Sequence, residues 1–283
     1  MFTNVMSRTL AKYANKTVLP TALSNATGIR KISWGSASIK NRRPYQEDHL
    51  FYHQYGKGGG VFGIADGHGS DRVASYMVGA FPDVFNDYYC GQSLTKGEIL
   101  TKTFHELESS LTHFAEPPHL EGSTLTVAMV EGREVTLAHT GDSPAFLWSK
   151  TGVTSLLTPH SLELEQEEER ILTHGGEIYE INGCLRVDGM LNISRSFGDF
   201  ALKDSGVIAT PQITSLSLGW DDWALVLASD GLTEAGFLER EMEDILHGAR
   251  SPQEASEKLV ASAQRKGASD NISVIVAPLF VKN

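Results

Sequence analysis

The stretch that decides the fold is "GVFGIADGHGS", residues 60–70. Its apolar run, residues 61–65, is bounded by turn residues, and such a run is typical of a buried strand. The run stops abruptly at Asp66, Gly67 and His68. A strand that served only the core would not end on a carboxylate and an imidazole, so this strand end predicts a functional site.

Other apolar stretches carry acidic residues at their ends in the same way. "WALVLASDGL" ends near Asp230, and "GASDNISVIV" places Asp270 just before a strand. "RRPYQEDHL" places Glu47 and Asp48 at the head of another short apolar stretch. A single Asp-Gly or Asp-Asn pair usually only makes a turn. The whole set indicates a common site, because strand ends hold their side chains rigidly.

Carboxylates brought together in this way repel one another and cannot all stay ionised unaided. A pair of hard divalent cations removes that repulsion, since Mg²⁺ and Mn²⁺ prefer carboxylate, carbonyl and water oxygens. The sequence therefore predicts two Mn²⁺ or Mg²⁺ ions per site.

The bulk composition excludes several classes of protein. The chain has 283 residues, 41% of them hydrophobic, and a formal net charge of −11. Such an acidic balance argues against nucleic-acid binding, and no apolar run approaches the ~18 residues of a membrane span. Cys90 and Cys184 show no metal-ligand spacing and form no disulfide framework, which fits a reducing compartment.

The first 31 residues differ from the rest of the chain. They are basic and rich in Ser and Thr, and no acidic residue occurs before Glu47. This composition is typical of a mitochondrial transit peptide, and a variable N-terminal arm is the alternative. We therefore expect an arm over residues 1–31 and one catalytic domain over residues 32–283. The predicted location is the mitochondrial matrix, or otherwise the cytoplasm or nucleus.

The remaining pattern alternates between strand-like and helix-like segments. The predicted strands are residues 60–65, 123–130, 134–139, 145–148, 223–229 and 272–277. The predicted helices are residues 71–89, 95–114, 163–174, 236–247 and 252–266. Several neighbouring strands are joined by short turns, which favours an α+β fold with antiparallel sheets over a doubly wound parallel sheet. The pattern alone leaves open whether there are one or two sheets.

From about residue 33 to its C-terminus, the sequence resembles the metal-dependent Ser/Thr protein phosphatases of type 2C. The motifs that carry the resemblance are "RPYQEDHL", "VFGIADGHG", "GSTLTVAMV", "LAHTGDSPAFL", "ERILTHGGEI", "LNISRSFGDFALK", "SGVIATPQI", "LASDGL" and "SDNISVIV". The "SRSFGD" and "SGVIATPQI" motifs, together with the basic arm, also resemble the mitochondrial branched-chain α-ketoacid dehydrogenase phosphatases. The resemblance implies a four-layer αββα sandwich of two antiparallel β-sheets flanked by helices.

The resemblance also assigns ligands to the two ions at one edge of the sandwich. Asp66 bridges the ions, and the carbonyl group of Gly67 binds the second. Asp230 and Asp270 hold the first ion. Glu47, with Asp48, binds a metal ion or orients its waters.

Three further side chains have roles in the implied reaction, in which a hydroxide attacks phosphorus without a phospho-enzyme. Arg43, four residues before Glu47, grips the phosphate through its planar guanidinium group. His68, held by Asp48, donates a proton to the leaving alkoxide. Asn271 shapes the turn that presents Asp270.

The sequence departs from the family pattern at two positions. Family members often bind a third ion through two Asp residues, and the matching residues here are Asp142 and Glu234. The longer Glu side chain puts that third ion in doubt. Pro144 stands where Arg is usual, so any contact of that Arg is lost. Residues 160–203 are expected to include a flap whose acidic stretch "LELEQEEER" either is a solvated helix face or selects basic phosphopeptides.

These features together predict a monomeric phosphatase that acts on phosphoserine and phosphothreonine in proteins. Two alternatives stay open. The chain could be a pseudophosphatase that serves as a binding module, although all the core positions are retained. It could also be a two-metal hydrolase of small phosphoesters.

Overall fold

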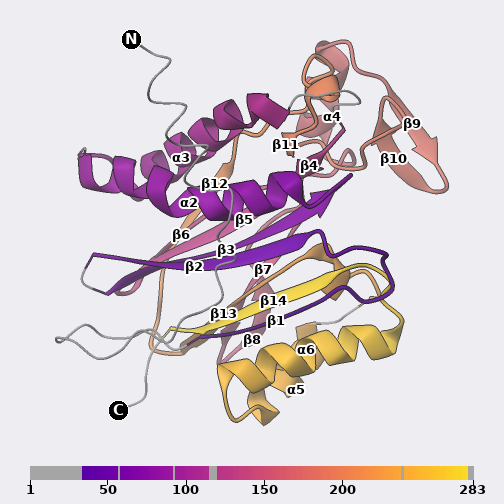
Figure 1. The fold of residues 1–283 in the computed structure, drawn as a ribbon. Helices are drawn as coiled ribbons and strands as arrows, with labels where there is room; N and C mark the ends of the chain where they lie inside the picture. The colour runs from indigo at the N-terminus through magenta and orange to yellow at the C-terminus, as the bar shows by residue number, and fades with distance from the viewer. Residues whose placement is uncertain (1–33, 57, 92, 115–119, 237–238, 280–283) are drawn as a thin grey trace.

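The computed structural model describes residues 34–56, 58–91, 93–114, 120–236 and 239–279. Two antiparallel sheets pack face to face, and helices cover the outer face of each sheet (Figure 1). This four-layer arrangement confirms the predicted α+β sandwich. The predicted N-terminal arm, residues 1–31, lies outside the described residues.

Both large sheets are antiparallel throughout their named strands. The five strands of the first sheet are, in spatial order, β1 (Gly35–Ile39), β14 (Ile272–Pro278), β13 (Asp222–Ala228), β7 (Ala145–Ser149) and β8 (Gly152–Ser155). The second sheet runs in the order β11 (Phe197–Gly198), β4 (Gly122–Ser123), β3 (Gly59–His68), β5 (Leu125–Glu131), β6 (Glu134–Thr140) and β12 (Gln212–Ser217). Its seventh strand, β2 (Asp48–Tyr55), pairs with β3.

The longer helices form the outer layers, and the three short 3-10 helices, labelled η, lie in the connections. They are α2 (Arg72–Gly91), α3 (Lys96–Ser110), η1 (Leu111–Phe114), α4 (Glu165–Thr173), η2 (Phe200–Leu202), η3 (Asp230–Leu232), α5 (Glu239–Gly248) and α6 (Pro252–Lys266). Helices α2 and α3 lie over the second sheet, and α5 and α6 lie over the first (Figure 1).

Strand β3 is apolar on both faces because it lies inside the sandwich. Successive side chains of a strand point to opposite faces of the sheet. Val61 and Ala65 therefore pack in the core beneath α2 and α3. Phe62 and Ile64 pack in the core between the two sheets, with Leu225 of β13. The unbroken apolar run thus reflects burial on both faces.

The helix ends have local causes in the sequence. Helix α3 begins with a capping box, in which the Thr95 hydroxyl accepts from the Glu98 amide and the Glu98 carboxylate accepts from the Thr95 amide. Helix α6 begins at the Ser251 cap, followed by a Pro at the first helical position. It ends at Gly267, whose φ of 103° lies in the left-handed region that favours glycine.

The predicted elements are largely confirmed. Each predicted strand overlaps a strand of the structure, and Gly132, at φ 63°, turns the hairpin between β5 and β6. The predicted helix over residues 95–114 is divided into α3 and η1. In the segment 236–247, helix α5 is described from Glu239, and residues 237–238 lie outside the described residues.

The residues of the predicted flap, 160–203, form a smaller unit beside the second sheet. It contains α4 and a two-stranded hairpin of β9 (Ile178–Ile181) and β10 (Cys184–Val187). This flap has its own apolar cluster, which includes Leu162, Ile171 and Val207. In Figure 1 it lies beyond one end of the sandwich, on the side where β4 and β11 lie.

Among the described residues, no helix combines the length and the hydropathy needed to cross a bilayer.

Candidate active site

The pairing of β2 with β3 brings the first two acids together. Asp48 and Asp66 stand directly opposite each other in the register of the two strands. The backbone of Asp66 is held from its other side by β4 and β5, because its amide donates to the Thr124 hydroxyl (3.1 Å) and its carbonyl accepts from the Thr124 amide (2.9 Å). The Ser123 hydroxyl donates to the same carbonyl. The position of Asp66 is therefore fixed by the second sheet.

The first sheet supplies two more acids at the same edge. Strand β13 runs antiparallel to β14, so Asp230, just after β13, lies beside the residues that precede β14, including Asp270. The backbone approaches closely here, and a Cβ atom on Gly231 would lie 2.0 Å from the Asn271 carbonyl oxygen. Only glycine fits at that position. The two strand ends therefore lie close together.

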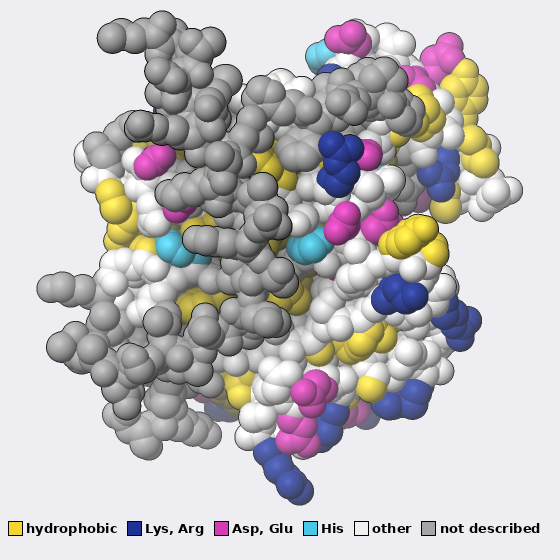
Figure 2. Space-filling view, in the orientation of Figure 1, with side chains coloured by type: hydrophobic (Ala, Val, Ile, Leu, Met, Phe, Trp, Pro, Cys, Tyr) yellow, Lys and Arg dark blue, Asp and Glu magenta, His cyan; other side chains and the backbone are white. Residues whose placement is uncertain are grey.

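One hydroxyl group joins the two sheets at this edge. The Ser229 hydroxyl donates to the Asp48 carboxylate (2.8 Å) and accepts from the amide of Ser273. In Figure 2, acidic and histidine side chains lie together near the middle of the visible face, over the ends of β2 and β3. The strand pairings and the Ser229 hydroxyl bring Asp48, Asp66, Asp230 and Asp270 to the same edge of the sandwich.

The carboxyl groups strongly perturb one another. Burial, and then the charges of Asp48 and Asp230, raise the pKa of Asp66 well above its usual range. Burial raises the pKa of Asp48 to about 6. Burial and the charge of Asp230 raise the pKa of Asp142 to about 7. Burial and the charge of Asp270 also raise the pKa of Asp230. The chain therefore gathers more negative charge at this edge than it neutralises.

The donor set fits hard divalent cations by its chemistry. It consists of carboxylate and carbonyl oxygens, and the buried Oδ1 atom of Asp48 has no hydrogen-bond partner among the described residues. Within the same residues, no group of three or more His, Cys, Asp or Glu side chains already has the arrangement of a metal site. The ligand roles of Asp66, Asp230 and Asp270 accordingly stay predictions.

Glu47 and Gly67 lie beside this group of acids. The Gly67 amide donates to the Glu47 carbonyl (3.2 Å), and the Glu47 amide donates to the Asn271 side-chain oxygen (2.8 Å). Burial raises the pKa of Glu47, although the charge of Arg43 opposes the shift. Their ligand roles stay predictions.

Arg43 lies at the site, in contact with one of the acids. Its Nη2 atom is 2.6 Å from Oδ2 of Asp270, and its side chain is 50% exposed. An exposed guanidinium group at this position is accessible to a phosphate group.

Asn271, which was expected to shape the turn that presents Asp270, also contacts the loop that carries Arg43. Its amide group donates to the carbonyl oxygens of Lys40 and Tyr45, both 2.9 Å away, and its oxygen accepts from Glu47. The side chain therefore fastens the loop between β1 and β2, which carries Arg43. Its backbone amide, in contrast, donates to Oδ1 of Asp270.

The partner of His68 is Asp199 and not Asp48, which corrects the sequence expectation. Nε2 of His68 lies 2.7 Å from Oδ2 of Asp199, whose side chain is only 2% exposed. Asp48 instead accepts from Ser229, because its side chain is buried between the sheets. Burial disfavours the charged form of His68, but the hydrogen bond and charge of Asp199 outweigh it and raise the pKa of His68.

Sequence reasoning overlooked Asp199, although it ends the quoted "SRSFGD" motif. Its φ of 46° is unusual for a residue other than glycine. A Cβ atom on Gly122 would lie 2.2 Å from the Asp199 carboxylate and 2.4 Å from Nε2 of His68. The glycine therefore leaves the space in which the two side chains meet, and the unusual backbone angle is the signal of a functional position.

The two residues expected to bind a third ion are engaged differently. Asp142 is close enough to Asp230 and His68 for their charges to affect its pKa. Glu234 instead accepts hydrogen bonds from Ser269 and from the amide of Asp270.

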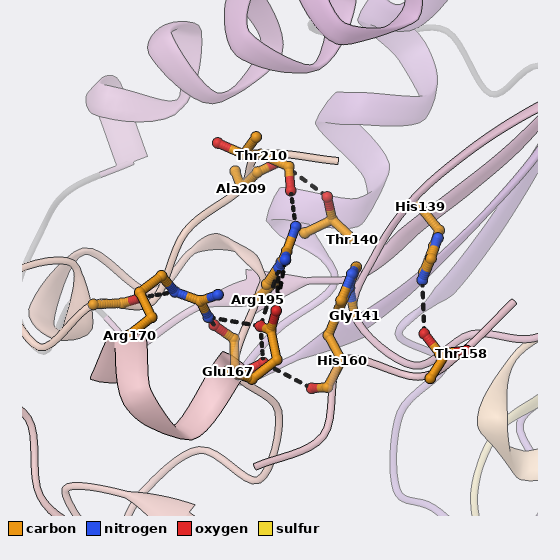
Figure 3. A network of polar contacts seen from close by, with 12 residues as sticks. His139, Thr140, Gly141, Thr158, His160, Glu167, Arg170, Arg195, Ala209 and Thr210 are labelled. Carbon is orange, nitrogen blue, oxygen red and sulfur yellow. Dashed lines mark hydrogen bonds and ion pairs between the residues drawn. The ribbon is translucent and has the colours of Figure 1, made fainter. Parts of the chain in front are cut away.

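The flap contains a buried acid that sequence reasoning took for part of a solvated face. Four glutamates of the acidic stretch are exposed: Glu163, Glu165, Glu168 and Glu169. Glu167 is buried, and it pairs with Arg195 (2.5 Å) and Arg170 (2.7 Å) and accepts from the Ser194 hydroxyl. Figure 3 shows both guanidinium groups directed at this carboxylate. Glu167 therefore has a structural role.

A stacked histidine pair joins this network to the site. The rings of His139 and His160 are 4.3 Å apart and nearly parallel. Nδ1 of His160 accepts from the amide of Gly141, and the Gly141 carbonyl accepts from the His160 amide. Burial and the neighbouring His139 lower the pKa of His160 to about 3, so the ring stays neutral and remains an acceptor. The backbone before Asp142 is thus fixed by the flap (Figure 3).

Comparison with known proteins identifies relatives over most of the chain. A family model described as "Protein phosphatase 2C" matches residues 35–272. The chain is 30% identical to Probable protein phosphatase 2C 71 of Arabidopsis thaliana, over 93% of this chain and 60% of that protein. It is 32% identical to "Protein phosphatase 1K, mitochondrial" of Xenopus laevis, over 77% of this chain and 60% of that protein. The chain thus spans about three fifths of these two relatives.

Solved structures show the same fold. A serine-threonine phosphatase 2C from Toxoplasma gondii superimposes with a TM-score of 0.78 at 18% identity, covering 89% of this chain and 96% of that one. A sex-determining protein of C. elegans superimposes with a TM-score of 0.84 at 24% identity, covering 90% of this chain and 66% of that one. The family model spans most of the sequence, and Asp66, Asp230 and Asp270 lie within it. The chain therefore belongs to the protein phosphatase 2C family.

Proposed function

We propose that this chain hydrolyses phosphoserine and phosphothreonine esters in proteins, as a monomer and with two Mn²⁺ or Mg²⁺ ions. The observation that carries the proposal is the convergence of Asp48, Asp66, Asp230 and Asp270 at one edge of the sandwich, in a member of a phosphatase family.

The residues that would hold the ions are Asp66, the carbonyl group of Gly67, Asp230, Asp270 and Glu47. When bound, two such ions supply a hydroxide nucleophile near neutral pH and neutralise charge on the phosphoryl oxygens. A structural relative at 19% identity and a TM-score of 0.64, the catalytic domain of the phosphatase PstP, is described in complex with two manganese ions. That description supports the number and kind of ions proposed here.

Arg43 is proposed to bind the phosphoryl group of the substrate. Its guanidinium group can grip two phosphate oxygens at once. The loop that carries it is fastened by Asn271, and the ion pair with Asp270 holds the group beside the acids. This support keeps the Arg43 side chain at the site before substrate arrives.

His68 is proposed to donate the proton that the leaving alkoxide needs. Its Nε2 atom is bound to Asp199, so Nδ1 is the atom from which the protonated ring can give up a proton. Asp199 fixes the orientation of the ring and stabilises its protonated form.

The site of action is proposed to be the mitochondrial matrix. The acid-free, basic N-terminus and the relative named protein phosphatase 1K, mitochondrial, both support this location. The resemblance to branched-chain α-ketoacid dehydrogenase phosphatases makes the phosphorylated dehydrogenase complex the first substrate to test. Fusion of residues 1–31 to a fluorescent protein should direct it to mitochondria, and a diffuse cytoplasmic signal would contradict the localisation.

The activity is tested by phosphate release from a phosphoserine peptide, with Mn²⁺ or with EDTA. The wild-type chain should release phosphate only with Mn²⁺, and Asp230→Asn should abolish the release. Asp221→Asn is the matched control, because this exposed residue precedes the opposite end of the same strand. Full activity of Asp230→Asn would contradict the metal assignment.

The same assay separates the two alternatives. A pseudophosphatase would release phosphate from neither the peptide nor p-nitrophenyl phosphate. A hydrolase of small phosphoesters would hydrolyse p-nitrophenyl phosphate, and an added phosphoprotein would not inhibit that hydrolysis. Competitive inhibition by a phosphoprotein is the result expected from the proposed function.

A further inference from the structure

Glu234 connects the two segments that carry Asp230 and Asp270. Its backbone amide donates to the Asp230 carbonyl, 2.9 Å away. Its Oε2 atom accepts from the amides of Ser269 (2.9 Å) and Asp270 (3.0 Å), and its Oε1 atom accepts from the Ser269 hydroxyl (2.7 Å). One residue thus bonds to the backbone of both acids.

The turn that Glu234 caps lies between two regular elements. Helix α6 ends at Lys266, before its cap Gly267, and β14 begins at Ile272. The Ala268 carbonyl accepts from the Asn41 side chain, whereas the amides of Ser269 and Asp270 donate to Glu234. Glu234 fixes the backbone amide of Asp270. The Asp270 side chain is then oriented by Arg43 and by the amide of Asn271. The side chain of Asp270 can hold one direction only if its backbone is fixed first.

The same contacts argue against a role for Glu234 in binding a third ion. Oε2 accepts two hydrogen bonds from the turn, so an ion at Oε2 would have to displace one of them, and an ion at Oε1 would share that oxygen with the Ser269 hydroxyl. The extra methylene group of Glu, relative to Asp, is what lets the carboxylate reach the backbone of residues 269 and 270.

We propose that Glu234 is a positioning residue that sets the spacing between Asp230 and Asp270, and that it does not bind a third cation. The proposal rests on the proposed function in one respect, because it takes Asp230 and Asp270 as ligands of one ion. It predicts that Glu234 changes the affinity for that ion without changing the number of ions bound.

Calorimetric titration of the metal-free full chain with Mn²⁺ measures both quantities without any turnover. We expect two ions in the wild type and two in Glu234→Ala, with the dissociation constant of one ion raised about 10-fold. The effect is at the low end of the range for such residues because Glu234 is exposed and water can replace part of its contacts. Ser269→Ala, which removes one of the three hydrogen bonds, should raise the same constant about 3-fold.

A matched control distinguishes this effect from a general loss of a glutamate cap. Glu98 accepts from the Thr95 amide at the start of α3, a helix that packs on α2 and the second sheet. Glu98→Ala should leave Mn²⁺ binding unchanged. Circular dichroism checks that each variant is folded, and the Ser269→Ala measurement stands by itself if Glu234→Ala does not fold.

The outcomes separate the two hypotheses. If Glu234→Ala binds one ion fewer while Ser269→Ala binds like the wild type, Glu234 is a ligand and the proposal is wrong. If neither variant changes the affinity, the positioning role is wrong although the proposed function stands. A wild type that binds no Mn²⁺ would instead contradict the proposed function.

Discussion

Two regions of the molecule bury carboxyl groups, and they do so with opposite results. In the flap, burial alone would raise the pKa of Glu167, but hydrogen bonds from Arg195, Arg170 and Ser194 hold it well below its usual range. At the edge of the sandwich, burial and mutual repulsion raise the pKa of Asp48 to about 6 and bring Asp66 well above its usual value.

The difference lies in where the compensating charge comes from. A buried charge is tolerated when it is paired and hydrogen-bonded, and the flap provides two guanidinium groups for one carboxylate. The sandwich edge has Arg43 as its nearby cation, and that side chain is half exposed and bound to Asp270. The flap acid therefore stabilises the fold, whereas the described residues leave much of the charge of the edge acids uncompensated.

The largest effect should come from Asp66→Asn, which tests the edge. We expect metal-dependent turnover to fall at least about 10³-fold, or 4 kcal/mol, since a two-metal site supplies several kcal/mol to the transition state. In EDTA the variant should melt at the same temperature as the wild type or a few degrees higher, because it removes a repelling buried carboxyl group. Thermal unfolding followed by circular dichroism checks the second part. A fall of the melting temperature would show that Asp66, like Glu167 in the flap, stabilises the metal-free fold.

Glu167→Gln should have the opposite effect on stability. Removing one partner of a buried ion pair is strongly destabilising, and we expect a loss of about 3 kcal/mol at pH 7. The loss is at the low end of the usual range because Arg170 and Arg195 keep backbone carbonyl partners. Urea unfolding measures it, and Glu169→Gln, an exposed residue of the same helix, should change stability by less than about 0.5 kcal/mol.

The pH dependence of this loss follows from the sign of the pKa shift. Glu167 has a pKa below its unfolded value of about 4.3, so its contribution is fully present above that pH and is lost as the pH falls further. The wild type and Glu167→Gln should therefore converge in stability as the pH falls below about 4. A difference that grows on acidification would mean that the ion pair is not the source of the effect.

The strands that could be predicted from the sequence are those buried on both faces. β3, β13 and β14 are continuous apolar runs because they lie between a helix layer and the other sheet. β12 alternates between partly buried and exposed residues at the edge of its sheet, and its pairing with β6 defines it. A polar edge strand leaves no apolar run to detect.

The same distinction applies to the site residues. Asp66, Asp230 and Asp270 could be found because each lies at the end of an apolar strand. Asp199 lies in an irregular segment, and its contact with His68 spans 131 residues of sequence. Glu167 looked like its solvated neighbours because the arginine that buries it, Arg195, comes from another segment. Such long-range partners cannot be read from local patterns.

The contact between His68 and Asp199 joins the sandwich edge to the flap segment. His68→Ala tests whether His68 is the general acid. We expect turnover of a phosphoserine peptide to fall about 10²-fold, because its alkoxide leaving group needs a proton. Turnover of p-nitrophenyl phosphate should fall much less, since its leaving group is stable as an anion. Asp199→Asn should show the same preference with smaller losses. Equal losses on both substrates would remove the general-acid role.

The smallest effect should come from Ser194→Ala, which weakens the flap network without breaking it. The Ser194 hydroxyl donates to the Glu167 carboxylate, which keeps both arginines in the variant. A hydrogen bond to a charged group contributes about 1.5 kcal/mol, so urea unfolding should show a loss of about that size. Because Glu167 stays ionised from pH 6 to pH 8, the loss should be constant over that interval. Metal-dependent turnover should be retained in the folded variant, since the flap carboxylate has its charge compensated within the chain. A loss of turnover as large as that of Asp66→Asn would show that the activity of the acid cluster depends on the charge balance of the flap network.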